Sequence, residues 1–220
     1  MYRFFVENKE NNSFVLSKEL LNHLKVIRIR EENIICIYEE KFYICKLEND
    51  LAIIIEELNE NHEYAKEVIL CSSLINIKRF EWMIQKAAEL GATKIIPIIT
   101  QNTNYKYKDI SKSKMIRWNE ISKNACEQSF RNKIMKIDEP MNFQDAIKIE
   151  SKYKIIAHEK HNETKVSSLN DDIIIFVGPE GGFTENEIEM AEKNGFNTVS
   201  LGNRILRSET SSIFLLSIIK

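Results

Sequence analysis

Two glycine-containing loops near the C-terminus carry the residues whose types and spacing could do chemistry. Five of the six glycines of this 220-residue chain lie between Gly178 and Gly202. The first loop covers residues 178–182 (GPEGG) and the second covers residues 201–204 (LGNR), and each follows an apolar run and precedes a helical pattern. Glycine permits positive φ and lets another group approach the backbone closely. The clustering therefore predicts a binding crevice in the last fifth of the chain.

The first loop lacks the usual phosphate-binding patterns. Neither G-x-G-x-x-G nor G-x-x-x-x-G-K-[ST] is present, and no lysine lies in the loop. Glu180, in the middle of the loop, would repel a pyrophosphate. We therefore expect a nucleotide-like ligand that has no phosphate or that carries positive charge. S-adenosylmethionine has both properties, because it combines an adenosine with a sulfonium cation.

Two charged residues follow the second loop. Arg207 and Glu209 stand at the start of a predicted helix over residues 208–219, whose remainder is apolar on nearly every side. Such a helix must be buried in a core or a subunit interface, so it would hold both side chains rigidly near the crevice. The alternative interpretation is a turn followed by a structural ion pair.

The elements that must position these loops fall into two parts. Residues 1–65 contain closely spaced β-like runs and one helical stretch, which is typical of a small barrel. Over residues 66–220 strands alternate with helices, and the unbroken apolar run 173–177 indicates a central strand covered on both faces. Thr184 and Glu187 match a capping box, which would fix the first loop to a rigid helix. The chain is therefore predicted to be α/β, with a parallel sheet in its second domain.

Composition and charge narrow the class of protein. Residues 78–136 carry 13 Lys and Arg against 5 Asp and Glu in a chain of net charge -2, which indicates either a polyanion-binding face or a solvated helical surface.

No apolar run reaches the roughly 20 residues of a membrane span, and no signal peptide is evident, so we expect a soluble, cytoplasmic protein without a membrane partner. The four scattered cysteines predict neither disulfides nor a zinc site. The pair His158-x-x-His161 lacks a third ligand, so no metal is expected.

Five segments, taken together, resemble a known family. Residues 176–183 (FVGPEGGF) and 201–210 (LGNRILRSET) are similar to the two signature motifs of the RsmE-type 16S ribosomal RNA uridine-N3 methyltransferases. Residues 84–91, 117–131 and 3–28 contain supporting matches, so the resemblance covers nearly the whole chain. The two glycine motifs, in this order and spacing, are the most specific part of it.

The resemblance implies a fold, a reaction and a set of partners. The fold would be a PUA-like RNA-binding barrel followed by a SPOUT α/β methyltransferase domain with a C-terminal trefoil knot, working as a homodimer. The reaction would be methyl transfer from S-adenosylmethionine to N3 of one uridine, position 1498, of 16S ribosomal RNA. The enzyme would recognise this RNA in the assembled small subunit. The implied RNA-binding residues are Arg3, Arg28 and Arg131, and the implied cofactor-binding residues are Val177, Gly178, Glu180, Gly181, Gly182, Leu201, Gly202, Ile205 and Leu206.

The catalytic roles follow from the chemistry of the base. N3 of uracil carries a proton, so the enzyme must align the methyl group with N3 and stabilise the developing anion. Arg207 is the first candidate for holding the uracil oxygen or a phosphate, and Glu209 is a weaker candidate for the base. One departure concerns Gln101 and Asn102, which stand where the family usually has a Glu-Arg pair. Two alternatives stay open: a SPOUT methyltransferase acting on another RNA site, and a non-catalytic RNA-binding ribosome-assembly factor.

Overall fold

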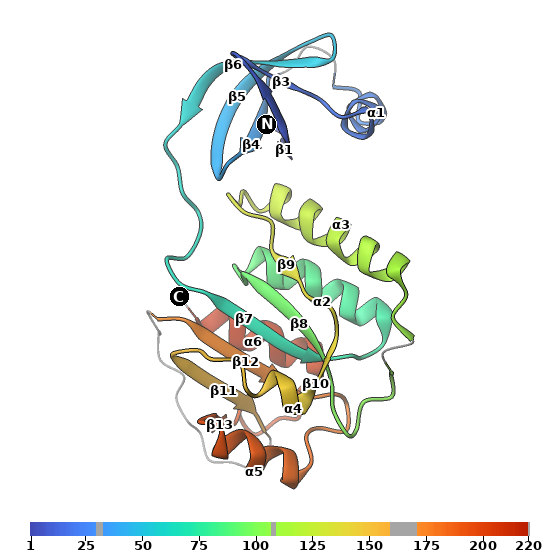
Figure 1. The fold of residues 1–220 in the computed structure, drawn as a ribbon, viewed down its shortest axis with the longest axis vertical. Coiled ribbons are helices and arrows are strands. Elements are labelled where there is room, and N and C mark those ends of the chain that lie inside the picture. Colours follow the sequence, from blue (N-terminus) through green and yellow to red (C-terminus); the bar gives the residue numbers. More distant parts are fainter. Residues whose placement is uncertain (30–32, 107–108, 159–170, 220) are drawn as a thin grey trace. The chain divides into compact units, whose positions relative to one another are not determined.

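The computed structural model describes residues 1–29, 33–106, 109–158 and 171–219, which form two compact units (Figure 1). The first unit comprises Met1–Glu63 together with Cys126–Lys133. The second comprises Tyr64–Ala125 and Ile134–Lys220. The boundary after residue 63 lies close to the one expected from sequence, but the sequence assigned residues 126–133 to the second domain, whereas their contacts group them with the first.

The first unit is built on a curled six-stranded sheet. Its strand order is β1-β4-β5-β6-β3-β2, with β1 parallel to β4 and the other neighbours antiparallel. One helix, α1, is capped by the Ser17 side chain. The apolar residues that alternate along β4 and β5 fill the core beneath the sheet. The elements are β1 (Arg3–Phe5), β2 (Asn8–Glu10), β3 (Ser13–Val15), α1 (Lys18–Val26), β4 (Asn33–Tyr38), β5 (Lys41–Glu48) and β6 (Leu51–Leu58).

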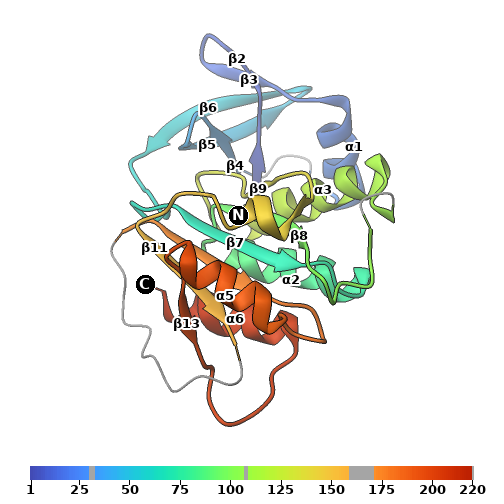
Figure 2. The same ribbon diagram turned by 60° about the horizontal axis from the view of Figure 1, so that its bottom comes forward.

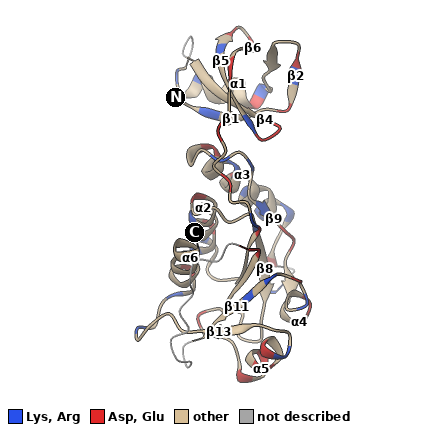
Figure 3. Cartoon of the chain, turned by 90° about the vertical axis from the view of Figure 1, so that its left-hand side faces the viewer, with Lys and Arg blue, Asp and Glu red and all other residues tan. Residues whose placement is uncertain are grey.

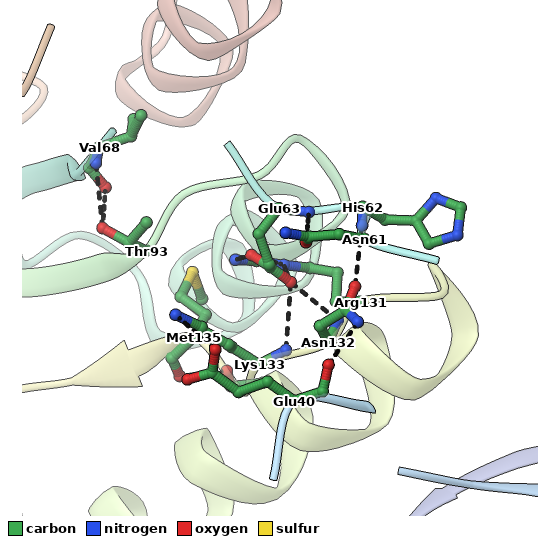
Figure 4. A network of polar contacts seen from close by, with 11 residues as sticks. Glu40, Asn61, His62, Glu63, Val68, Thr93, Arg131, Asn132, Lys133 and Met135 are labelled. Atoms are coloured by element: carbon green, nitrogen blue, oxygen red, sulfur yellow. Dashed lines mark hydrogen bonds and ion pairs between the residues drawn. The ribbon is translucent and has the colours of Figure 1, made fainter. Parts of the chain in front are cut away.

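The segment Cys126–Lys133 joins the first unit through a buried polar network (Figure 4). Arg131 pairs with Glu63 at 2.5 Å, and both side chains are less than a tenth exposed. Glu63 also accepts backbone hydrogen bonds from Asn132 and Lys133, so its carboxylate is well satisfied. Phe130 adopts φ of +62°, ends the helix that precedes it, and stacks on Phe42. The helix that contains residues 117–128 of the family-like segment therefore stops at Gln128.

The second unit contains a parallel sheet. Its strand order is β10-β8-β7-β12-β11-β13, with β9 paired to β8. The two central strands, β7 and β12, are buried at every position, as the unbroken apolar run 173–177 predicted. Burial also raises the pKa of the Cys71 thiol on β7 well above its ordinary value, so this thiol stays uncharged. The strands are β7 (Val68–Ser73), β8 (Lys94–Ile99), β9 (Lys136–Ile137), β10 (Met141–Asn142), β11 (Tyr153–Ala157), β12 (Ile173–Val177) and β13 (Asn197–Val199).

Helices cover this sheet on both faces, as Figures 1 and 2 show. One face packs against α4 and α5 in a core that includes Phe143, Phe176 and Ile188. On the other side, α6 contacts β7 and β12 and packs along α2. The predicted alternation of strands and helices is therefore confirmed. The helices are α2 (Ile77–Glu89), α3 (Lys112–Gln128), α4 (Phe143–Ala146), α5 (Glu185–Lys193) and α6 (Ser208–Ile218).

Candidate functional site

The first glycine loop leaves the carboxyl end of β12, where open α/β sheets bind ligands. The backbone N–H of Gly182 donates to the carbonyl of Pro179, which closes a tight turn, and Gly182 has φ of +66°. A Cβ on Gly178 would lie 3.2 Å from the carbonyl carbon of Gly182 and 3.2 Å from the Phe183 ring. The turn therefore needs glycine at Gly178 because there is no space for a side chain, and at Gly182 because of its backbone conformation.

The first loop is anchored on both sides. Thr184 and Glu187 form the predicted capping box at the start of α5. The buried Glu187 carboxylate also accepts a hydrogen bond at 2.9 Å from the backbone N–H of Gln101, just after β8. Next to it, Asn102 Nδ2 donates to the carbonyls of Gly181 and Gly182, each at 3.1 Å. The two residues that depart from the family pattern thus hold the glycine loop in place.

The second glycine loop connects β13 to α6. Gly202 has φ of +103°, a conformation that a residue with a Cβ rarely adopts. Arg207 is the N-cap residue of α6, makes no side-chain capping bond, and is exposed. Ser208, the first residue of the helix, is buried, and its Oγ has no hydrogen-bond partner. The loop therefore ends with an exposed guanidinium beside a buried hydroxyl.

Both loops line one cavity of about 410 Å³ within the second unit. Such a volume suits a cofactor-sized ligand. The cavity brings together all nine residues predicted to bind the cofactor, and Arg207 as well. Its walls also include residues that the sequence analysis did not predict, namely Ala157, His158, Pro179, Phe183, Arg204, Ser208 and Ser211.

Glu209 lies elsewhere. It is 7 % exposed, and among the residues that the structure describes it is not one of those that line the cavity. Its Oε1 lies 3.8 Å from Nε of Arg79, which comes from α2. The same arginine has Nη1 3.6 Å from Oε1 of Glu180 in the first loop. Glu209 is therefore engaged by a cation rather than facing the cavity as a base would.

The chain is similar to known RNA methyltransferases. The family model described as an RNA methyltransferase domain matches residues 62–220. Ribosomal RNA small subunit methyltransferase E of Mesomycoplasma hyopneumoniae is 41 % identical over 99 % of this chain and 98 % of its own length. The protein of the same name from Bacillus subtilis is 33 % identical over 100 % of this chain and 96 % of its own length.

This chain belongs to the ribosomal RNA small subunit methyltransferase E family.

Solved structures agree with this assignment. The Neisseria gonorrhoeae member of the family, in a crystal structure bound to S-adenosyl methionine, has a TM-score of 0.88 at 29 % identity and covers 99 % of this chain and 95 % of its own. A putative methyltransferase from Legionella pneumophila, solved with the same cofactor, has a TM-score of 0.86 at 28 % identity, with 99 % and 96 % covered. The chain is therefore a methyltransferase by family and by fold.

The three arginines predicted to bind RNA lie in the first unit of this methyltransferase, in different environments. Arg28 is exposed, with φ of +62°. Arg3 donates to the carbonyl of Gln128 at 2.9 Å, and its guanidinium carbon lies 4.5 Å from the centre of the Phe130 ring. Arg131 is buried against Glu63, which does not support an RNA contact. Of the three, Arg28 is the one whose side chain faces solvent.

The residues that the structure describes contain neither a metal-ligand cluster nor a helix that could span a membrane. Within that part of the chain, no group of three or more His, Cys, Asp and Glu could hold a metal ion. His158 lines the cavity, whereas its sequence partner His161 lies outside the described residues. No helix in the described ranges is long and apolar enough to cross a membrane.

Proposed function

We propose that this protein transfers the methyl group of S-adenosylmethionine to N3 of a single uridine, position 1498, in 16S ribosomal RNA. The observation that carries the proposal is the single cavity lined by both glycine loops with Arg207 in its wall. The relatives at 41 % and 33 % identity are ribosomal RNA small subunit methyltransferases, which supports the ribosomal RNA substrate. The cofactor in two similar structures supports the methyl donor.

The residues of the cavity fit this cofactor. When bound, S-adenosylmethionine supplies an electrophilic methyl group on a sulfonium. No atom lies within 4 Å of a Cβ placed on Gly182 or Gly202, so a ligand can pack directly against the main chain at both positions. The buried Ser208 Oγ without a partner is a hydrogen-bonding group suited to the polar end of the ligand. Arg204, Arg207 and Glu180 provide both signs of charge, as the cofactor's carboxylate, ammonium and sulfonium require.

Arg207 would act on the substrate base. An exposed guanidinium at the mouth of the cavity can donate to a uracil oxygen and stabilise the anion that develops when N3 loses its proton. Because N3 lies on the Watson–Crick edge, the target uridine must be unpaired or splayed out of its stack. Glu209 keeps only an indirect role in this proposal, because Arg79 engages it.

Ribosomal RNA would contact the basic segment 78–136 and the first unit. The described, exposed lysines of this segment include Lys78, Lys106, Lys112 and Lys123, and its basic residues on α2, α3 and β9 are blue in Figure 3. Lysines of this kind bind phosphates without reading sequence. Arg28 would add a contact from residues 1–65, which we propose to be the PUA-like RNA-binding domain. The substrate would be the assembled small subunit in the cytoplasm.

Residues 66–220 would be a SPOUT domain with a C-terminal trefoil knot that pairs with a second copy of itself. Trp82 on α2 is 47 % exposed and Phe214 on α6 is 43 % exposed. The two helices pack together, so these large apolar side chains belong to one packed layer of the unit. Exposed aromatic residues of this kind support a homodimer interface.

Mass spectrometry of 16S ribosomal RNA tests the proposal. RNA from cells that lack the protein should contain unmodified uridine at the target, and the purified protein with S-adenosylmethionine should restore N3-methyluridine there. Methylation at a different nucleotide would favour another RNA methyltransferase activity. Absence of any methyl transfer, with RNA binding retained, would favour an assembly factor and contradict the proposal.

A further inference from the structure

Arg79 lies between two carboxylates, one in the first glycine loop and one on the helix that follows the second glycine loop. Its Nη1 lies 3.6 Å from Oε1 of Glu180 in the first glycine loop, and its Nε lies 3.8 Å from Oε1 of Glu209 on α6. Helix α6 begins at Ser208, and only residues 205–207 separate it from the second glycine loop. One guanidinium on α2 therefore connects the segments that follow β12 and β13.

The buried member of this group needs the cation. The Glu209 side chain is 9 % exposed, and its Oε2 has no hydrogen-bond partner. A buried carboxylate without compensation is costly, because it loses its hydration. Arg79 supplies the compensating positive charge, because it forms an ion pair with Glu209. Loss of Arg79 would therefore drive Glu209 toward solvent and shift the start of α6, where Arg207 and Ser208 line the cavity.

The position of Arg79 is unfavourable for its own helix. It is the third residue of α2, whose first turn contains no acidic residue and also carries Lys78. Cations near a helix N-terminus are disfavoured by the helix dipole. In contrast, Glu209 lies in the first turn of α6, where a carboxylate is favoured. The arginine therefore makes no local contribution that would explain its placement, and its partners in the two cavity segments do.

We propose that Arg79 is a positioning residue that holds the first glycine loop and the start of α6 at the spacing required to bind the methyl donor. This inference rests on the proposed function, since it concerns the same cavity. Arg79 is absent from the described lining of that cavity, so it acts through Glu180 and Glu209 rather than on the ligand.

The same helix offers a matched control. Arg117 on α3 pairs with Glu81 on α2, with Nε to Oε1 at 2.7 Å and Nη2 to Oε2 at 2.9 Å. This ion pair also involves α2 and an arginine, and its geometry is better than that of Arg79, but neither residue lines the cavity. If ion pairs to α2 affected cofactor affinity only by stabilising the fold, loss of Arg117 should lower that affinity at least as much as loss of Arg79.

The test is isothermal calorimetry of the full chain with S-adenosylmethionine and with S-adenosylhomocysteine, at a temperature where each variant is folded. Arg79→Met should weaken both affinities about tenfold, because the spacing of the loops affects both ligands. Arg79→Lys should recover part of the loss, and Arg117→Met should match the wild type. In methylation assays, Arg79→Met should raise KM for S-adenosylmethionine about tenfold, Arg79→Lys should lower it again in part, and Arg117→Met should leave it at the wild-type value.

Other results would contradict either the inference about Arg79 or the proposed function itself. Wild-type affinity in Arg79→Met would overturn the inference while leaving the proposed function intact. Equal losses in Arg79→Met and Arg117→Met would also overturn it, because the effect would then be general to α2. If Arg79→Met does not fold, Arg79→Lys and the exposed Glu180→Gln carry the test as a pair: losses of affinity that are less than additive in the double variant support the inference, and additive losses contradict it. If the wild type binds neither ligand, the proposed function fails first and the inference fails with it.

Discussion

Asn102 donates a hydrogen bond from Nδ2 to the carbonyl of Gly181 at 3.1 Å, across 79 positions of sequence. A Cβ on Gly181 would lie 3.3 Å from the Cβ of Asn102, so the two residues fit closely. By its place in the sequence, this asparagine stands only where the family usually has an arginine. In the structure it contributes to the shape of the cavity, because it holds the loop that forms one wall.

Asn102→Ala removes the donor to two loop carbonyls. Each hydrogen bond contributes about 1 kcal/mol, so the loop should loosen and the affinity for S-adenosylmethionine should fall by roughly fivefold to twentyfold. Calorimetry measures this change. Asn104→Ala, an exposed change in the same turn region, should leave the affinity unaltered. Equal affinities for both variants and the wild type would show that the contact does not shape the cavity.

Arg207→Ala should abolish methylation and leave the fold intact. Arg207 is exposed and makes no capping bond, so its removal should change the free energy of unfolding by less than about 0.5 kcal/mol. Loss of an anion-stabilising donor should lower kcat by roughly a hundredfold or more. Single-turnover methylation and thermal unfolding measure the two quantities. Unchanged turnover in this variant would remove Arg207 from the mechanism.

Gly202→Ala and Gly195→Ala form a matched pair. Both glycines have positive φ, +103° and +85°, and at both positions an added Cβ would meet no atom within 4 Å. Each substitution should therefore destabilise the protein by about 1–2 kcal/mol through backbone strain. Only Gly202 lines the cavity, so only Gly202→Ala should also weaken cofactor binding. Calorimetry that finds equal affinities for the two variants would contradict the assignment of the second loop to the site.

Arg131→Met should destabilise the first unit. The change leaves the buried Glu63 carboxylate without its ion-pair partner, which costs about 3 kcal/mol. Urea unfolding followed by fluorescence should report this loss, whereas Lys46→Met, which breaks an exposed pair with Glu48, should have almost no effect. RNA affinity should stay unchanged under folding conditions. A specific loss of RNA binding with normal stability would instead restore the RNA-binding role predicted from sequence.

Local features were readable from the sequence because their causes lie within a few residues of one another. The capping box of Thr184 and Glu187 depends on a spacing of three residues, and the strand 173–177 is marked by its own unbroken apolar run. The glycines of the two loops are required by backbone conformation and close approach at their own positions. That both loops line one cavity depends in addition on how the sheet places β12 and β13.

The partners of these local features were decided by the tertiary structure alone. The links from Asn102 to Gly181, from Arg79 to Glu209 and from Arg131 to Glu63 each join residues that are far apart in the chain. The sequence shows which charged and polar side chains are present. It does not show which of the many carboxylates or carbonyls each one contacts. That choice depends on how parallel strands and their covering helices bring distant segments together, and this is why Glu209 was expected at the chemistry and Arg79 was not expected at all.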